Sequence, residues 1–128
     1  MPSSDAETKL NSALAHAIRA RFGPRCPCCG NPMHDGRVRK KNARAPNRRD
    51  RASVAHDVPV SMGGNVALWV WACRGCNNDQ GAMAFAFWAI RLELDGDPRA
   101  ARVAELAEFI RQWAEARGIR RVFRRRAA

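Results

Sequence analysis

Apolar residues in the first segment of the chain recur at every fourth position. They are Leu10, Leu14, Ile18 and Phe22. This spacing puts them along one face of an α-helix. Ser4 and Glu7 are spaced as a capping box at the start of that helix, and Gly23 followed by Pro24 ends it. The pattern predicts an amphipathic helix over residues 4–22.

The central segment shows a period of two instead, which is typical of a β-strand. Val66, Leu68 and Val70 form one apolar set, and Ala67, Trp69 and Trp71 lie between them. Upstream, His56 is followed by Pro59 and then by Gly63-Gly64, so an extended segment ends near His56 and a turn follows. We therefore expect two strands joined by a glycine loop. His56 would end the first strand, and a helix would begin at Asn77.

The C-terminal third has helical periodicity, first in a segment that is apolar almost all round. Residues 82–94 place Phe85, Trp88 and Leu92 on one helical face and Met83, Phe87, Ile90 and Leu94 on another. Such a helix has to be covered on both sides. A later stripe consists of Val103, Leu106, Ile110 and Trp113, after Asp97 as a cap and Pro98 at a first helical position. We expect helices over residues 77–94 and 98–117, with their Trp and Phe side chains in the core rather than stacked on bases.

Charge is strongly biased, because 23 Lys and Arg residues against 12 Asp and Glu residues give a net charge of +11. This excess favours nucleic acid as a partner, although an arginine-rich composition alone is equally consistent with no such partner. One basic cluster precedes His56 and comprises Arg37, Arg39, Lys40, Lys41, Arg44, Arg48, Arg49 and Arg51. A second lies in residues 119–128, a predicted mobile tail, and includes Arg124, Arg125 and Arg126. We interpret both as phosphate contacts; the alternative is a solvated face that aids solubility.

Four cysteines form two pairs with the spacing of metal ligands. The first CxxC knuckle is Cys26 and Cys29, and the second is Cys73 and Cys76. A two-residue spacer lets both thiolates of a knuckle reach one ion, and two knuckles complete a tetrahedron with bonds of about 2.3 Å. We predict a structural Zn²⁺ site, and buried or redox-active cysteines are the alternative. Because four cysteines fill such a site, we interpret Cys28 and His34 as non-ligands.

A strand, a glycine loop, a second strand and a helix, with one histidine and a CxxCN sequence, resemble the HNH endonuclease (ββα-metal) superfamily in its zinc-stapled, four-cysteine form. The resemblance covers about residues 24–82. It implies an α+β fold in which a ββα-metal core carries N-terminal and C-terminal helices. We accordingly expect one domain over residues 1–118, with helices at 4–22, 77–94 and 98–117, and a basic tail at 119–128.

The resemblance also implies roles for three residues. In HNH enzymes the histidine that precedes the sequence xxP is the general base that activates water, and His56 has this position. The last Asn or His of the motif binds a divalent ion at the scissile phosphate. Asn77 has that position, with Mg²⁺ or Mn²⁺ as the expected ion. Asn65 is the candidate for the middle asparagine, which would orient the His56 ring, and a turn residue after Gly64 is its alternative interpretation.

One position departs from the family pattern. Ala55 stands where the family usually has an Asp or His metal ligand. Asp57 is close by, but on a regular strand its side chain points to the face opposite His56. Two interpretations of Asp57 stay open: a ligand of the catalytic ion, turned inward by a bulge, or a group that holds the glycine loop or an arginine.

Together these features predict a metal-dependent HNH endonuclease that hydrolyses DNA phosphodiester bonds. The alternative is a zinc-stapled nucleic-acid-binding module that no longer cuts, because the usual acidic ligand is absent at Ala55. RNA stays open as a substrate, as do the target sequence and the oligomeric state. No apolar run approaches the roughly 20 residues of a membrane span, so we expect no membrane partner and a cytoplasmic protein.

Overall fold

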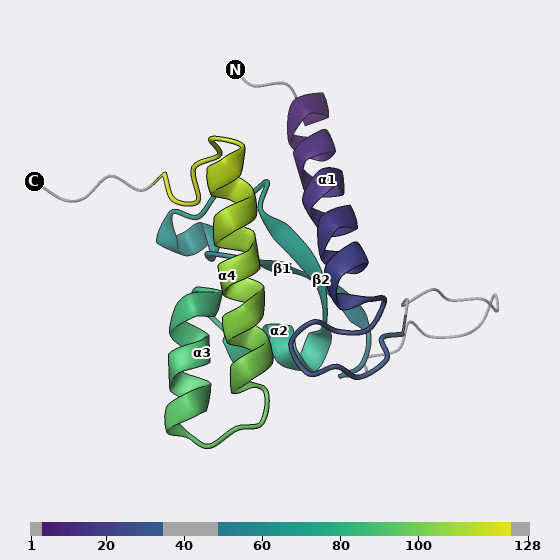
Figure 1. Ribbon diagram of the computed structural model, residues 1–128, viewed down its shortest axis with the longest axis vertical. Coiled ribbons are helices and arrows are strands. Elements are labelled where there is room, and N and C mark those ends of the chain that lie inside the picture. Colours follow the sequence, from purple (N-terminus) through teal and green to yellow (C-terminus); the bar gives the residue numbers. More distant parts are fainter. Residues whose placement is uncertain (1–3, 35–48, 124–128) are drawn as a thin grey trace, which may run out of the picture.

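Four helices and a two-stranded antiparallel sheet make up the part of the chain that the computed structural model describes, residues 4–34 and 49–123 (Figure 1). The helices are α1 (Ser4–Phe22), α2 (Arg74–Gln80), α3 (Phe85–Leu94) and α4 (Ala100–Ala116). The strands are β1 (Ala52–His56) and β2 (Trp69–Cys73), with a short 3₁₀ helix η1 (Val60–Met62) between them. The mixed α+β class predicted from the sequence is confirmed.

His56 is the last residue of β1, where the sequence predicts the end of a strand. Ala52 pairs with Cys73 and His56 pairs with Trp69 at the two ends of the ladder. A ladder of two five-residue strands is too short to be stable alone. It is covered by α1, which packs against β2, and by α2, which packs against both strands.

The second strand begins at Trp69, later than the alternating pattern from Val66 predicts. Asn65 is the reason. Its Oδ1 accepts from the Ala67 amide at 2.9 Å, and its carbonyl accepts from the Leu68 amide at 3.0 Å. These two bonds fold residues 65–68 into a turn, which removes them from the ladder despite their apolar side chains.

The segment predicted as one helix over residues 77–94 is instead two helices separated by a sharp turn. Gly81 has φ +57° and ψ −129°, a conformation that strains any residue with a side chain. The Gln80 side-chain amide donates to the Met83 carbonyl at 2.9 Å and so satisfies the backbone within the turn. Apolar periodicity does not detect this break, because the residues after it are as apolar as a continuing helix would be.

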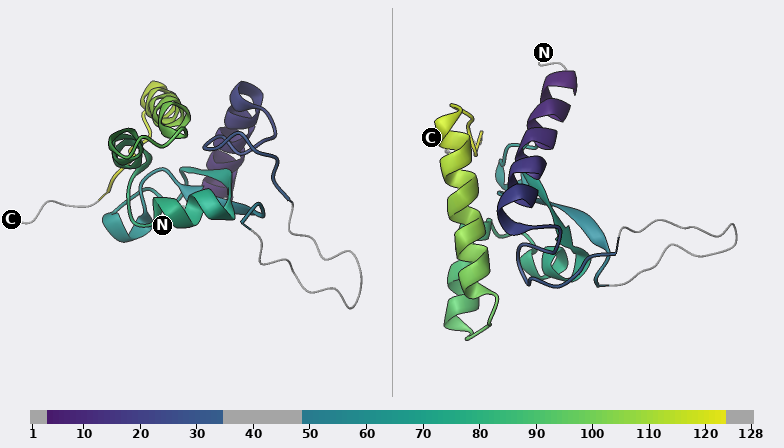
Figure 2. Two further views of the ribbon diagram at one scale, coloured as in Figure 1. Left: turned by 90° about the horizontal axis from the view of Figure 1, so that it is seen from below. Right: turned by 45° about the vertical axis from the view of Figure 1, so that its right-hand side comes forward.

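Helices α3 and α4 form a hairpin, and α4 lies within the predicted range of residues 98–117 (Figure 2). The buried face of α3 carries the predicted residues Phe85, Trp88 and Leu92. On its other face, Phe87 is 70% exposed and Leu94 is 78% exposed. The expectation that this helix is covered on both sides is therefore wrong for the described residues. The α3–α4 hairpin lies at the outside of the fold, so α3 packs against α4 and the core on one side only.

The core lies between α1, the sheet and α4. Leu14 and Ile18 of α1 are buried there, as the four-residue spacing predicts. At the end of α1 the Phe22 ring meets the Phe109 ring of α4 edge to face, with centroids 5.8 Å apart. This contact fixes the start of the cysteine loop, which follows α1 directly.

Candidate functional site

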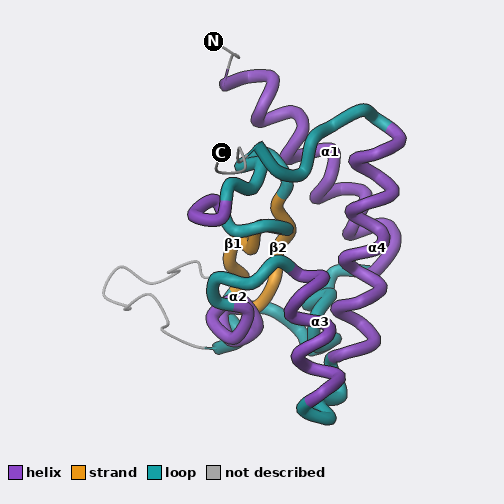
Figure 3. Tube along the Cα trace, turned by 90° about the vertical axis from the view of Figure 1, so that its left-hand side faces the viewer, coloured by secondary structure: helices purple, strands orange, loops and turns teal. Residues whose placement is uncertain are grey.

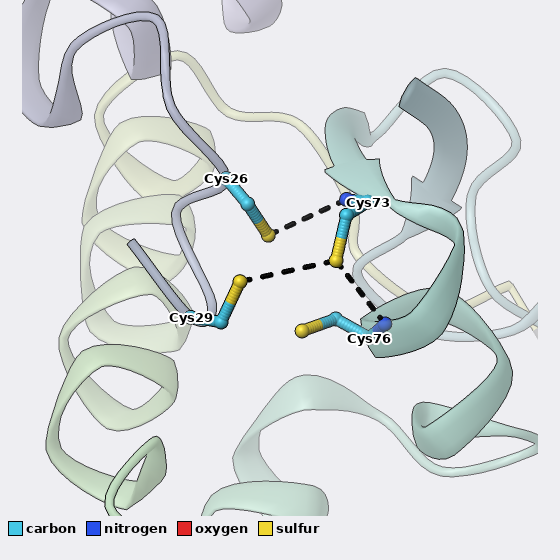
Figure 4. Close-up of side chains that lie close together, drawn as sticks. All are labelled: Cys26, Cys29, Cys73 and Cys76. Atoms are coloured by element: carbon cyan, nitrogen blue, oxygen red, sulfur yellow. Dashed lines mark hydrogen bonds between the residues drawn. The ribbon is translucent and has the colours of Figure 1, made fainter. Parts of the chain in front are cut away.

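The four predicted metal-binding cysteines come together from two distant parts of the chain (Figure 4). Cys26 and Cys29 lie in the loop after α1, whereas Cys73 ends β2 and Cys76 lies in the first turn of α2. All four Sγ atoms lie within 4.8 Å of one another, and those of Cys29 and Cys73 are 3.9 Å apart. Thiolates around a tetrahedral ion with bonds of about 2.3 Å would be about 3.8 Å apart. The cluster can therefore hold a metal ion, and the buried Cys28 is not part of it.

Backbone turns direct the thiolates toward one point. In the first knuckle the Gly30 amide donates to the Cys26 carbonyl at 2.7 Å, and Gly30 has φ +78°, which favours glycine. In the second knuckle the Cys73 thiol caps α2 by accepting from the Cys76 amide at 3.4 Å. The Cys73 amide also donates to Cys26 Sγ at 3.3 Å, which joins the two knuckles. Because α2 begins inside the second knuckle, the cluster sets the position of that helix.

Hydrogen bonds from neighbouring thiols, including that of Cys28 beside the cluster, favour a thiolate on Cys26. Bonds from Cys28, Cys73 and Cys76 hold the pKa of Cys26 far below its ordinary value. In turn, hydrogen bonding to Cys26 raises the pKa of Cys73 and of Cys76 well above their ordinary values. Only a cation at the centre of the cluster lets all four side chains be thiolates, which is the form that binds metal.

Arg99 places a fixed positive charge beside the cluster. Its guanidinium donates to Cys76 Sγ at 3.5 Å, to Asp79 at 2.9 Å and to Asp97 at 2.8 Å. The same group lies over the Trp88 ring, 5.1 Å from its centre. The Arg99 side-chain and backbone hydrogen bonds to Asp97 lower the pKa of that carboxyl to about 2. A divalent ion with four thiolates keeps a net negative charge, so a fixed guanidinium suits such a centre.

His56 is half-buried at the end of β1. Burial lowers the pKa of its imidazole below the ordinary value of about 6.5, and a hydrogen bond to the Val66 backbone opposes this shift without cancelling it. The ring is therefore neutral at pH 7. A neutral imidazole is the form that can accept a proton, as a general base must.

Helix α2 lies along the outer edge of β1 and contacts it with two amide side chains (Figure 3). Asn77 Nδ2 donates to Ser53 Oγ at 2.9 Å and to the Val54 carbonyl at 3.1 Å. One turn later, Gln80 Nε2 donates to the His56 carbonyl at 2.9 Å. The structure thus brings Asn77 and the His56 backbone carbonyl to the same edge of β1. Within the described residues the Asn77 and His56 side chains make no direct hydrogen bond.

Asp57 is fully buried and its carboxylate is paired with an arginine. Arg121 Nε donates to one carboxylate oxygen at 2.8 Å and Arg121 Nη2 to the other at 3.2 Å. The Asp57 amide donates to the Leu68 carbonyl, and its carbonyl accepts from the Phe85 amide, each at 3.0 Å. This is the arrangement expected if Asp57 holds an arginine and the glycine loop. Its carboxylate oxygens face Arg121 rather than a site shared with Asn77.

Asn65 uses its side chain on the backbone. Besides the bond from Ala67, its Nδ2 donates to the Arg120 carbonyl at 2.7 Å. The residue is buried, and its own amide donates to the Arg121 carbonyl at 2.9 Å. These contacts match the turn-residue interpretation, and within the described chain Asn65 makes no hydrogen bond to the His56 ring.

The basic clusters are described only in part. In the first cluster, Arg49 pairs with Asp79 at 3.0 Å, and the Arg51 carbonyl accepts from the Arg74 amide at 2.7 Å. The remaining members lie outside the described residues: Arg37, Arg39, Lys40, Lys41, Arg44 and Arg48, and in the tail Arg124, Arg125 and Arg126. In the predicted mobile tail over residues 119–128, Ile119 donates to the Ala114 carbonyl of α4, and residues 120–123 are bonded or bridged to residues 63–65 of the glycine loop, so the structure corrects the prediction for residues 119–123.

Three residues at these sites were not singled out from the sequence. Gln80 and Arg121 have no local signal, because one is a polar residue in a polar helix and the other is one arginine in an arginine-rich segment. Arg99 follows Asp97 by two positions, and its backbone amide donates to the Asp97 carboxylate, which is a common local bond of aspartate. That spacing alone does not point to a thiolate partner on Cys76.

The chain was compared with protein-family models, curated proteins and solved structures, and none of them matches it. Among the described helices, none is long and apolar enough to cross a membrane. The functional assignment therefore depends on the site residues themselves.

Proposed function

We propose that this protein is a metal-dependent endonuclease of the HNH (ββα-metal) type that hydrolyses DNA phosphodiester bonds. One observation carries the proposal: α2, which starts at a cysteine knuckle, is bound through Asn77 and Gln80 to the edge of β1 beside His56. A base at a strand end and an amide oxygen from the neighbouring helix can approach one phosphate from two directions. The high positive charge of the chain supports a polyanionic substrate.

His56 is the general base in this proposal. Its lowered pKa keeps the ring neutral at pH 7, so it can take a proton from the attacking water. The Gln80 amide fixes the backbone at His56 from the side of α2. Asn77 Oδ1 would hold Mg²⁺ or Mn²⁺, and such an ion would supply stabilisation of negative charge on the scissile phosphate and the leaving oxygen.

We assign the four-cysteine cluster to a structural Zn²⁺ ion. Four cysteine ligands leave no open position for water or substrate, which is typical of a structural rather than a catalytic zinc site. The fixed Arg99 guanidinium at Cys76 supports this assignment, because charge-assisted hydrogen bonds to a ligand sulfur stabilise a thiolate-rich centre.

A nicking assay on supercoiled plasmid tests the nuclease proposal. We expect cleavage with Mg²⁺ or Mn²⁺ and none with EDTA, provided that zinc content is unchanged by the chelator treatment. The alternative is a binding module, which the pairing of Asp57 with Arg121 and the alanine at position 55 favour. Wild-type protein that binds DNA but never nicks it, together with nicking by Ala55→Asp, would establish the binding module. Because Ala55 is fully buried, that variant must first be shown to fold.

DNA affinity should depend steeply on salt, and the last five residues should contribute to that slope. Each phosphate neutralised on duplex DNA adds about 0.9 to the slope of log affinity against log salt. Deleting residues 124–128 removes three arginines, so the slope should become shallower by up to about 2.7. The deletion begins at residue 124 so that Arg121 and its ion pair with Asp57 are kept. Fluorescence anisotropy with a labelled duplex at several salt concentrations measures the slope.

The matched control for this deletion is Arg111→Gln. Arg111 is paired with Glu108 and Glu115, at 2.6 and 2.7 Å, so two carboxylates already balance its charge on the surface of α4. The Arg111→Gln variant should have the same slope of log affinity against log salt as the wild type. An unchanged slope in the deletion variant would mean that residues 124–128 aid solubility and do not contact phosphate.

A further inference from the structure

The end of the described chain is joined to the loop that follows His56. This β1–β2 loop consists of residues 57–68, and the C-terminal segment consists of residues 119–123. Gly64 forms an antiparallel bridge with Val122, and the Phe123 amide donates to the Gly63 carbonyl at 2.7 Å. Figure 3 shows the C-terminal segment beside this loop, beyond the end of the strands. The loop therefore gains a backbone partner from the far end of the sequence.

The loop offers little room for other conformations at this contact. A Cβ at Gly64 would lie 1.9 Å from the Val58 carbonyl oxygen, so the loop is folded tightly on itself and needs glycine there. Asn65 binds the carbonyls of Arg120 and Arg121 with its side-chain and backbone amides. The C-terminal segment thus satisfies polar groups that the loop cannot pair internally.

The strongest contact between the two segments is the ion pair of Arg121 with Asp57. The carboxylate is completely buried and receives two guanidinium hydrogen bonds. A buried carboxylate without a partner is costly, so the loop keeps this conformation only while Arg121 is in place. Asp57 is the residue directly after His56, and its backbone is bonded to Leu68 and Phe85. The pair therefore fixes the chain at the point where the candidate base leaves the strand.

We propose that the C-terminal segment fixes the β1–β2 loop, and that Arg121 is a positioning residue for the His56 ring. The ring contacts the backbone of Val66, which belongs to this loop, so its orientation depends on the loop conformation. The catalytic part of the inference rests on the proposed nuclease function, whereas the effect on the ring does not. Loss of Arg121 opens the loop to hydrate Asp57 and lets the ring take several orientations.

The variant Arg121→Met tests this inference, with Arg121→Lys as a milder change that keeps the charge but loses the bidentate geometry. The NMR signals of the three histidine rings are the readout that needs no enzymatic activity. We expect the His56 signal to shift or broaden in Arg121→Met, less so in Arg121→Lys, while the His16 and His34 signals stay unchanged. An unchanged His56 signal in a folded Arg121→Met protein overturns the inference, whether or not the protein is a nuclease.

Cleavage kinetics form the second readout. A misplacement of about 1 Å in a catalytic group can cost about 100-fold in rate, so we expect kcat of Arg121→Met to fall by about 10- to 100-fold with KM little changed. Wild-type protein that does not cut contradicts the proposed function, and the ring signal then decides the inference by itself. Wild-type kcat in Arg121→Met overturns the positioning role.

Two controls separate positioning from other effects of the substitution. Arg120→Met removes the same charge one position earlier, and Arg120 is exposed and does not contact Asp57. If loss of one positive charge weakens DNA binding, KM should rise equally in Arg120→Met and Arg121→Met. The His56 signal and kcat of Arg120→Met should equal those of the wild type. Ile110→Val removes one buried methylene group from the core of α4 and leaves the loop unchanged, so it reports what lost stability alone does to both readouts. An effect of Ile110→Val as large as that of Arg121→Met would overturn a positioning role.

Discussion

Replacing His56 by alanine is expected to lower the cleavage rate by about 100-fold or more, because general-base catalysis typically contributes about 10²- to 10⁴-fold. The side chain is half-buried at the end of β1, and the hydrogen bonds of the residue to Gln80 and to the strand involve only its backbone. The fold and the cysteine cluster should therefore survive the substitution. Single-turnover cleavage at saturating Mg²⁺, together with zinc content and duplex affinity, measures the three properties separately.

His16→Ala is the matched control for this substitution. His16 lies on an exposed face of α1, so its loss removes the same side chain far from β1. Its cleavage rate should equal that of the wild type. Nicking by His56→Ala at the wild-type rate would contradict the assignment of His56 as the base and would direct attention to another proton acceptor.

The same assignment fixes the direction of the pH dependence. Burial lowers the His56 pKa in the folded protein, so the ring stays neutral down to a pH below about 6.5. The cleavage rate should be maintained at pH 6.5 and should fall only as the pH drops through the lowered pKa. Folding stability should already decrease as the pH falls from about 6.5 toward that lowered pKa, because over this range the unfolded chain binds a proton that the folded ring does not.

Local sequence features predicted the parts of the site that short-range chemistry determines. The CxxC spacing identified four cysteines whose sulfur atoms do converge, because each knuckle is a self-contained turn. Pro59 and the Gly63-Gly64 pair placed the end of a strand at His56, since neither proline nor a tight glycine turn continues a ladder. The first helix likewise has the predicted bounds, Ser4–Phe22.

The remaining features depend on contacts between distant residues. Asp57 and Arg121 are 64 positions apart, and nothing near either residue distinguishes a buried ion pair from a metal ligand or a basic tail. The break at Gly81 is determined by how α2 and α3 pack, whereas the apolar pattern is the same for one helix or two. The exposed face of α3 shows the same limit, because a pattern gives the faces of a helix but not the number of its neighbours.

Removing the zinc ion that we propose for the cluster is expected to unfold the protein, and Cys73→Ser should have nearly the same effect. Structural zinc binds zinc-finger peptides with about 10–16 kcal/mol of apparent free energy, whereas a whole domain is stable by only about 5–15 kcal/mol. The cluster also joins the loop after α1 to the start of α2, so its loss separates the helix from the sheet edge. Metal analysis should find one zinc ion per chain, and circular dichroism should show loss of the cooperative thermal transition after chelation.

Cys28→Ser provides the control within the same loop, because Cys28 is buried beside the cluster but is not one of the four converging cysteines. It should keep one zinc ion per chain and a cooperative transition, with a loss of about 1 kcal/mol for a buried substitution of this size. Metal-free protein that melts like the wild type would refute the structural role of zinc. A Cys28→Ser variant that loses its zinc would instead mean that Cys28 replaces Cys29 as a ligand, since a thiolate at either position ends the same short turn.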